Sequence, residues 1–268
     1  MDSSAAAVSP AFMLSVDVEP DWGAQAAPGA PQAGLDEGLP WLLETLERHG
    51  ARATFFVVGE LAEAFARRCP PGGAHEVGAH GLTHRRLSWL GEAELDEELS
   101  GARARLEGVG FRVEGFRAPF FDAPPDLGAR LARAGYRYDA SAGGLLPSAA
   151  NRPHAPRAPA RGAGDVTRLS GDALRLLRAP ANLTWLRLLD PCGLPLLPAR
   201  PRHFLLHLHE LVPAASGLAT LPWPLSRLHA RGSGLRAREL LDCVLRRARD
   251  AGQAFVTGRE LAAAAAGA

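Results

Sequence analysis

Short apolar runs alternate with amphipathic helical stretches along most of the chain. Ala11–Val18 and Ala53–Val58 are apolar runs of strand length, while Leu35–His49 between them places apolar residues on one helical face and stops at Gly50. The same patterns predict further strands at 75–77, 115–117, 136–139, 203–208 and 254–256, and further helices at 60–68, 92–106, 126–134, 237–250 and the Ala-rich C-terminus. Such alternation is typical of an α/β fold with a parallel sheet and outer helices, either open or closed into a barrel.

Length and composition fit a globular protein. The 268 residues suit a single α/β barrel of roughly 250 residues as well as two smaller domains, and 47% hydrophobic with 22% charged residues excludes wholesale disorder. The longest uncharged run, 211–226, is interrupted by three prolines and is too broken for a membrane helix. Met1–Pro10 lacks the pattern of a signal peptide, and three distant cysteines argue against a disulfide framework. We therefore expect a cytoplasmic protein.

Polar side chains follow the predicted strands at the point where each strand ends. These residues are Asp17, Glu19, His80, His84, Arg117, Asp139 and His207. In α/β barrels the carboxyl ends of the strands form the face on which active sites are assembled. The placement favours an enzyme over a purely structural protein.

Two of these groups together suggest a metal site. In His80-Gly-Leu-Thr-His84 the two imidazoles share a face if the segment is helical, and a loop can also bring them to one ion. Alone, such a pair is usually incidental, and Asp17 and Glu19 taken alone could belong to a solvated turn. Two neutral imidazoles with one carboxylate form an open shell for a divalent ion, and the second carboxylate is then free to act as a base.

Arg117 and the imidazoles after 203–206 complete the candidate set. Arg117 either neutralises nearby carboxylates or holds the base in place and keeps it ionised. His207 and His209 lie on one face of a predicted strand, so at least one is expected to point into the site if the strand lines a barrel.

These motifs resemble the polysaccharide deacetylase family, carbohydrate esterase family 4, in the branch whose first motif is D-x-E or D-x-D. The resemblance covers about residues 11–260 and rests on five segments, namely Ser15-Val-Asp-Val-Glu19, His80-Gly-Leu-Thr-His84, Arg117-Ala-Pro-Phe120, Tyr138-Asp-Ala-Ser141 and His207-Leu-His-Glu210. It implies an irregular (β/α)7 barrel at 11–268 after a flexible N-terminus at 1–10, and metal-dependent removal of acyl groups from sugars.

Carried over residue by residue, the resemblance implies a role for each candidate. Asp17 is the expected general base, and Glu19, His80 and His84 are the expected ligands of one divalent ion, expected to be zinc. Arg117 supports Asp17, His207 is the general acid, and Asp139 orients His207. The residues expected to contact substrate are Phe120, whose neighbouring backbone N–H would help hold the oxyanion, Trp22 and His209.

Three departures from the family pattern leave alternatives open. Glu19 is longer than the usual Asp, so Asp21 is an alternative ligand. His209 is an alternative acid to His207. The Pro/Arg-rich stretch at about 142–202 has no clear family counterpart and is expected to be an insert that covers or remodels the cleft.

The expected function is therefore hydrolysis of an N-acyl group, acetyl or formyl, on a sugar or glycan, with an acylated carbohydrate and no nucleic acid as partner. Two alternatives are a hydrolase of a non-sugar C–N amide, as in relatives resembling allantoinases, and a non-catalytic glycan-binding barrel. The metal content of the purified protein distinguishes the deacylase from both.

Charge is unevenly distributed. Residues 1–150 carry 13 Arg against 21 acidic residues, whereas 151–268 carry 17 Arg against 8. The excess in Arg152–Arg202 is either an ordinary solvated loop or a surface for phosphate oxygens, which guanidinium groups bind bidentately. The second interpretation predicts a phosphate- or lipid-linked substrate and peripheral contact with the inner membrane face.

Overall fold

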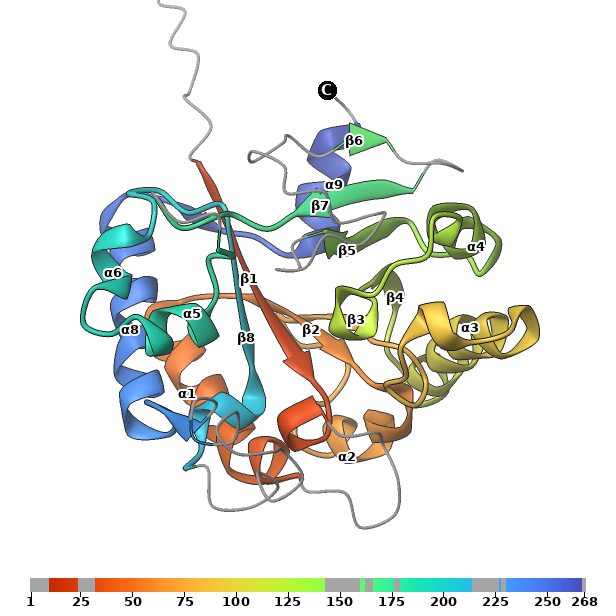
Figure 1. Ribbon diagram of the computed structural model, residues 1–268, viewed down its shortest axis with the longest axis horizontal. Coiled ribbons are helices and arrows are strands. Elements are labelled where there is room, and N and C mark those ends of the chain that lie inside the picture. The colour runs from red at the N-terminus through yellow and green to blue at the C-terminus, as the bar shows by residue number, and fades with distance from the viewer. Residues whose placement is uncertain are drawn as a thin grey trace, which may run out of the picture.

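The computed structural model describes residues 10–23, 32–142, 160–161, 166–175, 179–213, 227 and 230–266. One curled sheet runs through these residues, with helices on its outer surface (Figure 1). Its strands are β1 (Ala11–Val18), β2 (Ala53–Val57), β3 (Glu76–Ala79), β4 (Val113–Phe116), β5 (Tyr138–Ala142), β6 (Ala160–Arg161), β7 (Thr167–Ser170), β8 (His203–His207) and β9 (Ala254–Phe255). The helices are α1 (Leu39–His49), α2 (Ala62–Ala66), α3 (Glu92–Gly108), α4 (Leu127–Arg133), α5 (Leu183–Leu188), α6 (Gly193–Leu196), α8 (Leu235–Asp250) and α9 (Gly258–Ala266).

The strand order is β6-β7-β5-β4-β3-β2-β1-β8, and β9 pairs with the start of β1. All neighbouring strands are parallel except β6 and β7. The order ends at β8 on one side and β6 on the other, so the described strands form an incompletely closed barrel. An isolated bridge between Asn182 and Leu205 attaches the segment before α5 to β8. This is the irregular α/β barrel that the sequence predicts.

Alternation along β1 separates the outer core from the barrel interior. Phe12, Leu14, Val16 and Val18 belong to the large apolar cluster that the outer helices cover. Met13 points the other way and packs with Phe56, Tyr138 and Ala262 of α9 in a smaller interior cluster. The interior is therefore apolar at the N-terminal end of the strands and becomes polar toward their carboxyl ends, where Ser15 and Asp17 follow Met13 on β1.

Glycine makes room for this interior filling. A Cβ on Gly115 of β4 would lie 2.1 Å from the Tyr138 ring, so no side chain fits there. α1 ends for a different reason: Gly50 adopts a left-handed φ of 59° and its N–H caps the carbonyls of Leu46 and Glu47.

Most expected elements form close to their expected positions, and the main additions fall in 142–202. That stretch contains β6, β7, α5 and α6, so part of it belongs to the sheet. Asn182 begins α5 by accepting a hydrogen bond from Trp185 N at 2.9 Å. The proposed cleft-covering insert remains a prediction, and the expected flexible N-terminus lies outside the described residues except for residue 10. No helix in the described ranges is both long and apolar enough to cross a membrane.

Candidate metal and catalytic site

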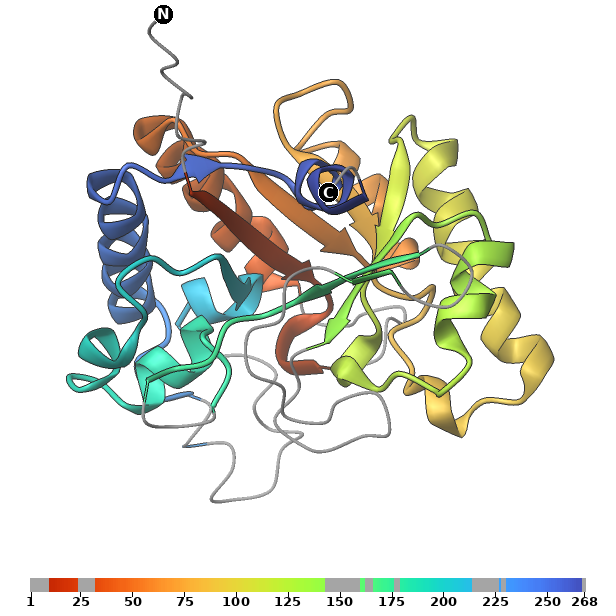
Figure 2. The same ribbon diagram turned by 90° about the horizontal axis from the view of Figure 1, so that it is seen from above.

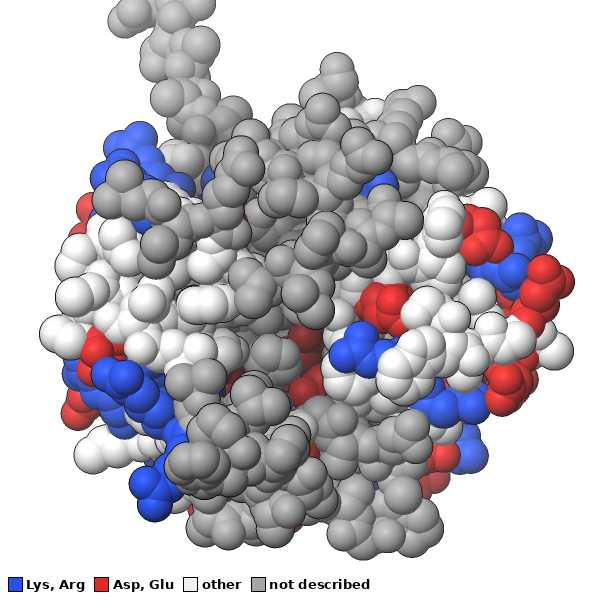
Figure 3. All heavy atoms as spheres, viewed as in Figure 1, with Lys and Arg blue, Asp and Glu red and all other residues white. Residues whose placement is uncertain are grey.

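The carboxyl ends of β1, β3, β4 and β8 bring the predicted polar residues together. Figure 2 shows these strands from a second direction, and Figure 3 shows acidic atoms near the middle of one face. Asp17 is the inward residue at the end of β1, and Glu19 follows the strand; both are buried. The register places Asp17 opposite His207 of β8.

Glu19, His80 and His84 form a group with metal-ligand geometry. One ligand atom of each lies within 4.8 Å of the other two. Glu19 Oε2 lies 2.7 Å from His84 Nε2 and 3.3 Å from His80 Nε2. The other ring nitrogen of His80, Nδ1, lies 2.9 Å from the Arg117 carbonyl oxygen, to which it can donate. That hydrogen bond leaves Nε2 as the ligand atom, the usual arrangement of a metal-binding histidine. The three donors therefore fit a divalent cation.

The two histidines converge from a loop and not from a helix. Gly81 and His84 both have positive φ, 75° and 62°, which no helix allows. Buried Glu98 of α3 holds the loop by accepting hydrogen bonds from Leu82 N at 2.7 Å and Thr83 N at 3.0 Å, and from the Thr83 hydroxyl. Sequence analysis did not identify Glu98; its place on the buried stripe of a helix was the available signal.

Glu19 and Asp21, the two candidate carboxylate ligands, differ in their hydrogen-bond partners. Burial acts to raise the pKa of Glu19, but the charge of His84 and hydrogen bonds from both ligand histidines outweigh it and hold this pKa well below its usual range. Asp21 instead accepts backbone hydrogen bonds from Ala33 N at 2.7 Å and Gly34 N at 3.0 Å. Both Asp21 oxygens are occupied in this way, so the geometry favours Glu19 as the ligand.

Arg117 holds Asp17 from the barrel interior. Its Nη1 donates to Asp17 Oδ1 at 2.5 Å, and its Nη2 donates to Ser15 Oγ at 2.9 Å and lies 3.2 Å from His203 Nε2. Its guanidinium carbon lies 4.2 Å from the centroid of the Phe56 ring. Burial and then the charge of Arg117 lower the pKa of His203 to about 3, so this imidazole is neutral and accepts. Sequence analysis missed Ser15 and His203, although each has the strand spacing of an inward residue.

His207 lies on the other side of Asp17. Its Nε2 is 3.8 Å from Asp17 Oδ2, and its Nδ1 is 3.3 Å from Glu210 Oε2. Buried Arg187 of α5 donates to Glu210 Oε1 from Nε at 3.0 Å and from Nη2 at 2.9 Å, and Thr184 Oγ1 donates to the same oxygen at 2.9 Å. Burial acts to lower the pKa of His207, but the Glu210 hydrogen bond and the charges of Glu19, Glu210 and Asp17 raise it to about 9.

The predicted role of Asp139 needs correction. Its Oδ1 accepts from Ser141 N at 2.8 Å, and its Oδ2 lies 4.0 Å from Arg168 Nε. Glu210 contacts Nδ1 of His207, so the orienting role assigned to Asp139 belongs to Glu210. Burial, only partly offset by hydrogen bonds from Ser141, raises the pKa of Asp139. Any other catalytic role for Asp139 remains a prediction.

The predicted substrate-contact residues surround this group. His209 stacks on His207 with ring centroids 5.2 Å apart and is tilted against Trp22 at 4.6 Å, and its Nδ1 lies 3.8 Å from Glu19 Oε1. Burial lowers the pKa of His209 to about 3. His207, which is the imidazole within reach of Asp17, is therefore better placed than His209 to be the acid. The Phe120 ring is tilted against the His84 ring, with centroids 4.6 Å apart, and Phe120 is 40% exposed.

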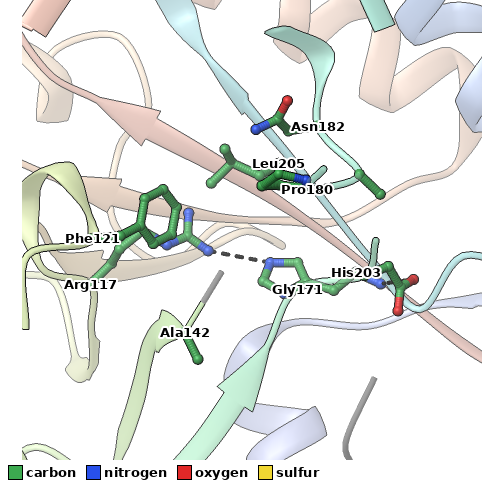
Figure 4. A pocket seen from close by; sticks show the side chains of 10 residues that line it. Arg117, Phe121, Ala142, Gly171, Pro180, Asn182, His203 and Leu205 are labelled. Carbon is green, nitrogen blue, oxygen red and sulfur yellow. Dashed lines mark hydrogen bonds between the residues drawn. The ribbon is translucent and has the colours of Figure 1, made fainter. Parts of the chain in front are cut away.

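A small cavity is lined in part by Arg117 and His203. Figure 4 shows Arg117 and His203 in direct contact in its lining, with Phe121, Leu205 and Pro180 also around the cavity. The cavity measures about 20 Å³, which suits a water-sized occupant. It therefore belongs to the support of Arg117 and not to a substrate cleft.

Comparison with known proteins relates the chain to deacetylases. Residues 28–138 match the family model described as polysaccharide deacetylase. A peptidoglycan deacetylase of Helicobacter pylori is 26% identical over 141 residues, which are 49% of this chain and 48% of the relative. A chitooligosaccharide deacetylase of Azorhizobium caulinodans is 37% identical over 87 residues, covering 30% of this chain and 40% of the relative. The chain thus spans less than half the length of these curated relatives.

The likeness of folds extends further than the likeness of sequences. The structure of a peptidoglycan N-acetylglucosamine deacetylase aligns with a TM-score of 0.55 and 17% identity, and covers 95% of this chain and 88% of that chain. At that identity the alignment supports the fold alone.

Proposed function

We propose that the chain, which matches the polysaccharide deacetylase family model over residues 28–138, belongs to that family and is a metal-dependent hydrolase that removes an N-acetyl or N-formyl group from a sugar or glycan. The observation that supports the proposal best is the convergence of three ligand atoms with two further ionisable groups. Glu19, His80 and His84 supply the ligand atoms, and Asp17 Oδ2 lies 3.9 Å from His80 Nε2 and 3.8 Å from His207 Nε2.

The ligand set suits zinc, which binds imidazole nitrogen and carboxylate oxygen and keeps positions open for water and substrate. When bound, a divalent cation polarises an acyl carbonyl and lowers the pKa of water. The hydrogen bond from His80 Nδ1 to the Arg117 carbonyl oxygen fixes the imidazole orientation that such binding requires.

Asp17 is the group that accepts a proton from the attacking water. Arg117 occupies Oδ1 and leaves Oδ2, which lies 3.9 Å from His80 Nε2, directed toward the ligand group. The buried guanidinium of Arg117 fixes the orientation of the carboxylate through this hydrogen bond. Since Ser15 and His203 hold the guanidinium in turn, the base has a fixed direction.

His207 is the group that gives a proton to the leaving nitrogen. The C–N bond breaks as the water oxygen bonds to the acyl carbon, and the sugar nitrogen takes the proton of His207 and leaves as an amine. Glu210 favours the protonated imidazole at neutral pH, which is the form that a general acid needs. The acyl group is released as a carboxylate.

The substrate class follows from the named relatives, which are deacetylases of peptidoglycan and chitooligosaccharide. A phosphate- or lipid-linked acyl sugar, met at the inner face of the membrane, is the finer proposal. It rests on the Arg-rich sequence of 152–202 and the apolar run at 211–226, much of which lies outside the described residues. Cytoplasmic location also remains a prediction.

The experiment is a screen for acetate and formate release from free, nucleotide-linked and lipid-linked acyl sugars, from chitooligosaccharides and from peptidoglycan. The zinc-loaded protein, the chelated protein and the chelated protein with zinc restored are compared. Release that disappears with the metal and returns with it supports the proposal. Equal release by the chelated protein, or none from any acylated sugar by the loaded protein, contradicts it.

A further inference from the structure

A row of contacting side chains runs from the metal-ligand loop to the protein surface. The ring centroids of His84 and Phe120 lie 4.6 Å apart. The guanidinium carbon of Arg86 lies 4.5 Å from the centroid of the same Phe120 ring. The same guanidinium carbon lies 5.4 Å from the ring of Trp89. An aromatic platform therefore begins at a metal ligand and ends at the surface.

The Asp122 side chain joins the two turns that carry the platform. Asp122, beside the turn that carries Phe120, accepts hydrogen bonds at Oδ2 from Ser88 N at 3.0 Å and from Ser88 Oγ at 2.7 Å. Phe120 itself has a left-handed φ of 57°, which is costly for an aromatic residue and is typical of positions where function requires a fixed direction. The turns are thus joined to each other before any ligand binds.

The outer part of the platform is open to solvent. Trp89 is 79% exposed, more than any other large hydrophobic residue among those the structure describes. A fixed, exposed aromatic face beside a catalytic site is suited to the apolar C–H face of a sugar ring. Apolar surface of this kind is informative when it lies next to a polar binding site.

Arg86 differs from its neighbour Arg85. Arg85 pairs with Glu94 at 2.9 Å and with Glu98 at 3.2 Å. Within the described part of the chain, the guanidinium of Arg86 contacts only the rings of Phe120 and Trp89. A guanidinium held over aromatic rings by cation–π contacts still has N–H donors that can pair with a planar or tetrahedral anion.

We infer that Arg86 and Trp89 form a subsite for an acidic sugar in the same glycan whose acyl group lies at the metal. Trp89 stacks on a pyranose ring, and Arg86 pairs with a carboxylate or phosphate on that sugar or the next. The inference rests on the proposed function and narrows its substrate to negatively charged acylated glycans.

The test measures binding by calorimetry in zinc-loaded protein carrying Asp17→Asn, which prevents turnover. The probes are a neutral tetrasaccharide of N-acetylglucosamine, the same tetrasaccharide bearing a phosphate monoester, and a peptidoglycan tetrasaccharide, whose muramic acid units carry carboxylates. Arg86→Gln is expected to weaken the acidic probes about threefold to tenfold and the neutral probe less than twofold. Trp89→Ala is expected to weaken all three probes about threefold to tenfold, because each loses the ring contact.

The control is Arg246→Gln on α8, whose exposed guanidinium pairs with Asp242 at 3.0 Å, and it is expected to change no probe. Zinc content equal to that of the parent shows that the ligand loop is intact in each variant. A loss confined to the phosphate probe or to the carboxylate probe identifies which anion Arg86 binds. Equal losses on neutral and acidic probes in Arg86→Gln, or no loss in either Arg86→Gln or Trp89→Ala, overturn the subsite. Failure of the parent protein with Asp17 to release acetate from these probes counts against the proposed function alone.

Discussion

The two sides of the site are held by different parts of the chain. On the metal side, Glu19, His80 and His84 lie in the loops that follow β1 and β3, and the carbonyl oxygen of Arg117 orients His80. On the acid side, His207 depends on Glu210, and Glu210 depends on Arg187 of α5. Short motifs set the metal side, whereas a buried ion pair between distant segments sets the acid side. A substitution on one side is therefore expected to impair that side and to leave the other side intact.

The largest effect is expected at Asp17, where the two sides meet. Asp17→Asn removes the proton acceptor but none of the three ligand atoms, so zinc is retained and the rate falls roughly 10²–10⁴-fold. Glu19→Gln is the matched variant on the metal side and is expected to weaken zinc affinity. Turnover and zinc content are measured on both proteins. Loss of zinc in Asp17→Asn with retention in Glu19→Gln would reverse the two roles.

The next effect concerns pH and tests the acid side. A general acid works while it is protonated, so activity declines as the pH rises through the pKa of His207. Glu210→Gln removes a charge that raises this pKa, so the alkaline limb of kcat/KM is expected to move to lower pH, and the rate is expected to fall about 10–100-fold. Asp139→Asn is the control and is expected to leave that limb in place. Movement of the limb by the control and not by Glu210→Gln would restore the role first assigned to Asp139.

Sequence patterns predict the metal side well because its information is local. The strand at Ala11–Val18 and the spacing of His80 and His84 are sufficient to place the ligands at one edge of the sheet. Asp139 was assigned to His207 by resemblance alone, and three-dimensional contacts reassign that role to Glu210.

The remaining residues have weaker patterns. Arg187 lies in an Arg-rich stretch of the kind that usually forms a solvated loop. The residues next to it in the sequence do not indicate that it is buried against Glu210. β7, which is short and alternates polar with apolar residues between irregular segments, is missed for the same reason. Glu98 lies on the buried stripe of α3, but because it is charged the sequence alone does not indicate that it accepts hydrogen bonds from the ligand loop.

A smaller effect concerns stability on the acid side. Arg187 and Glu210 are both almost fully buried, so Arg187→Leu leaves a buried carboxylate without its countercharge. The free energy of unfolding is expected to fall by about 3–5 kcal/mol. Urea denaturation followed by circular dichroism measures it. A loss below about 1 kcal/mol would mean that the pair is not what holds α5 to β8.

The smallest effect is expected at an exposed pair in the same region. Arg236 of α8 donates to both oxygens of Asp190, at 2.6 and 2.9 Å, but its side chain is 44% exposed. Arg236→Gln is therefore expected to cost no more than about 1 kcal/mol of unfolding free energy, and less at high salt. The same urea denaturation at low and high salt checks it. A loss as large as that of Arg187→Leu would show that burial does not explain the difference.

Zinc content per chain, measured after dialysis in wild-type protein, His84→Ala and His207→Ala, tests most directly whether the two sides are separate. The ligand set predicts one ion per chain in the wild type and in His207→Ala, because His207 contributes no ligand atom, and none in His84→Ala. Retention of zinc by folded His84→Ala, or its loss from folded His207→Ala, would contradict the assignment of the metal to Glu19, His80 and His84.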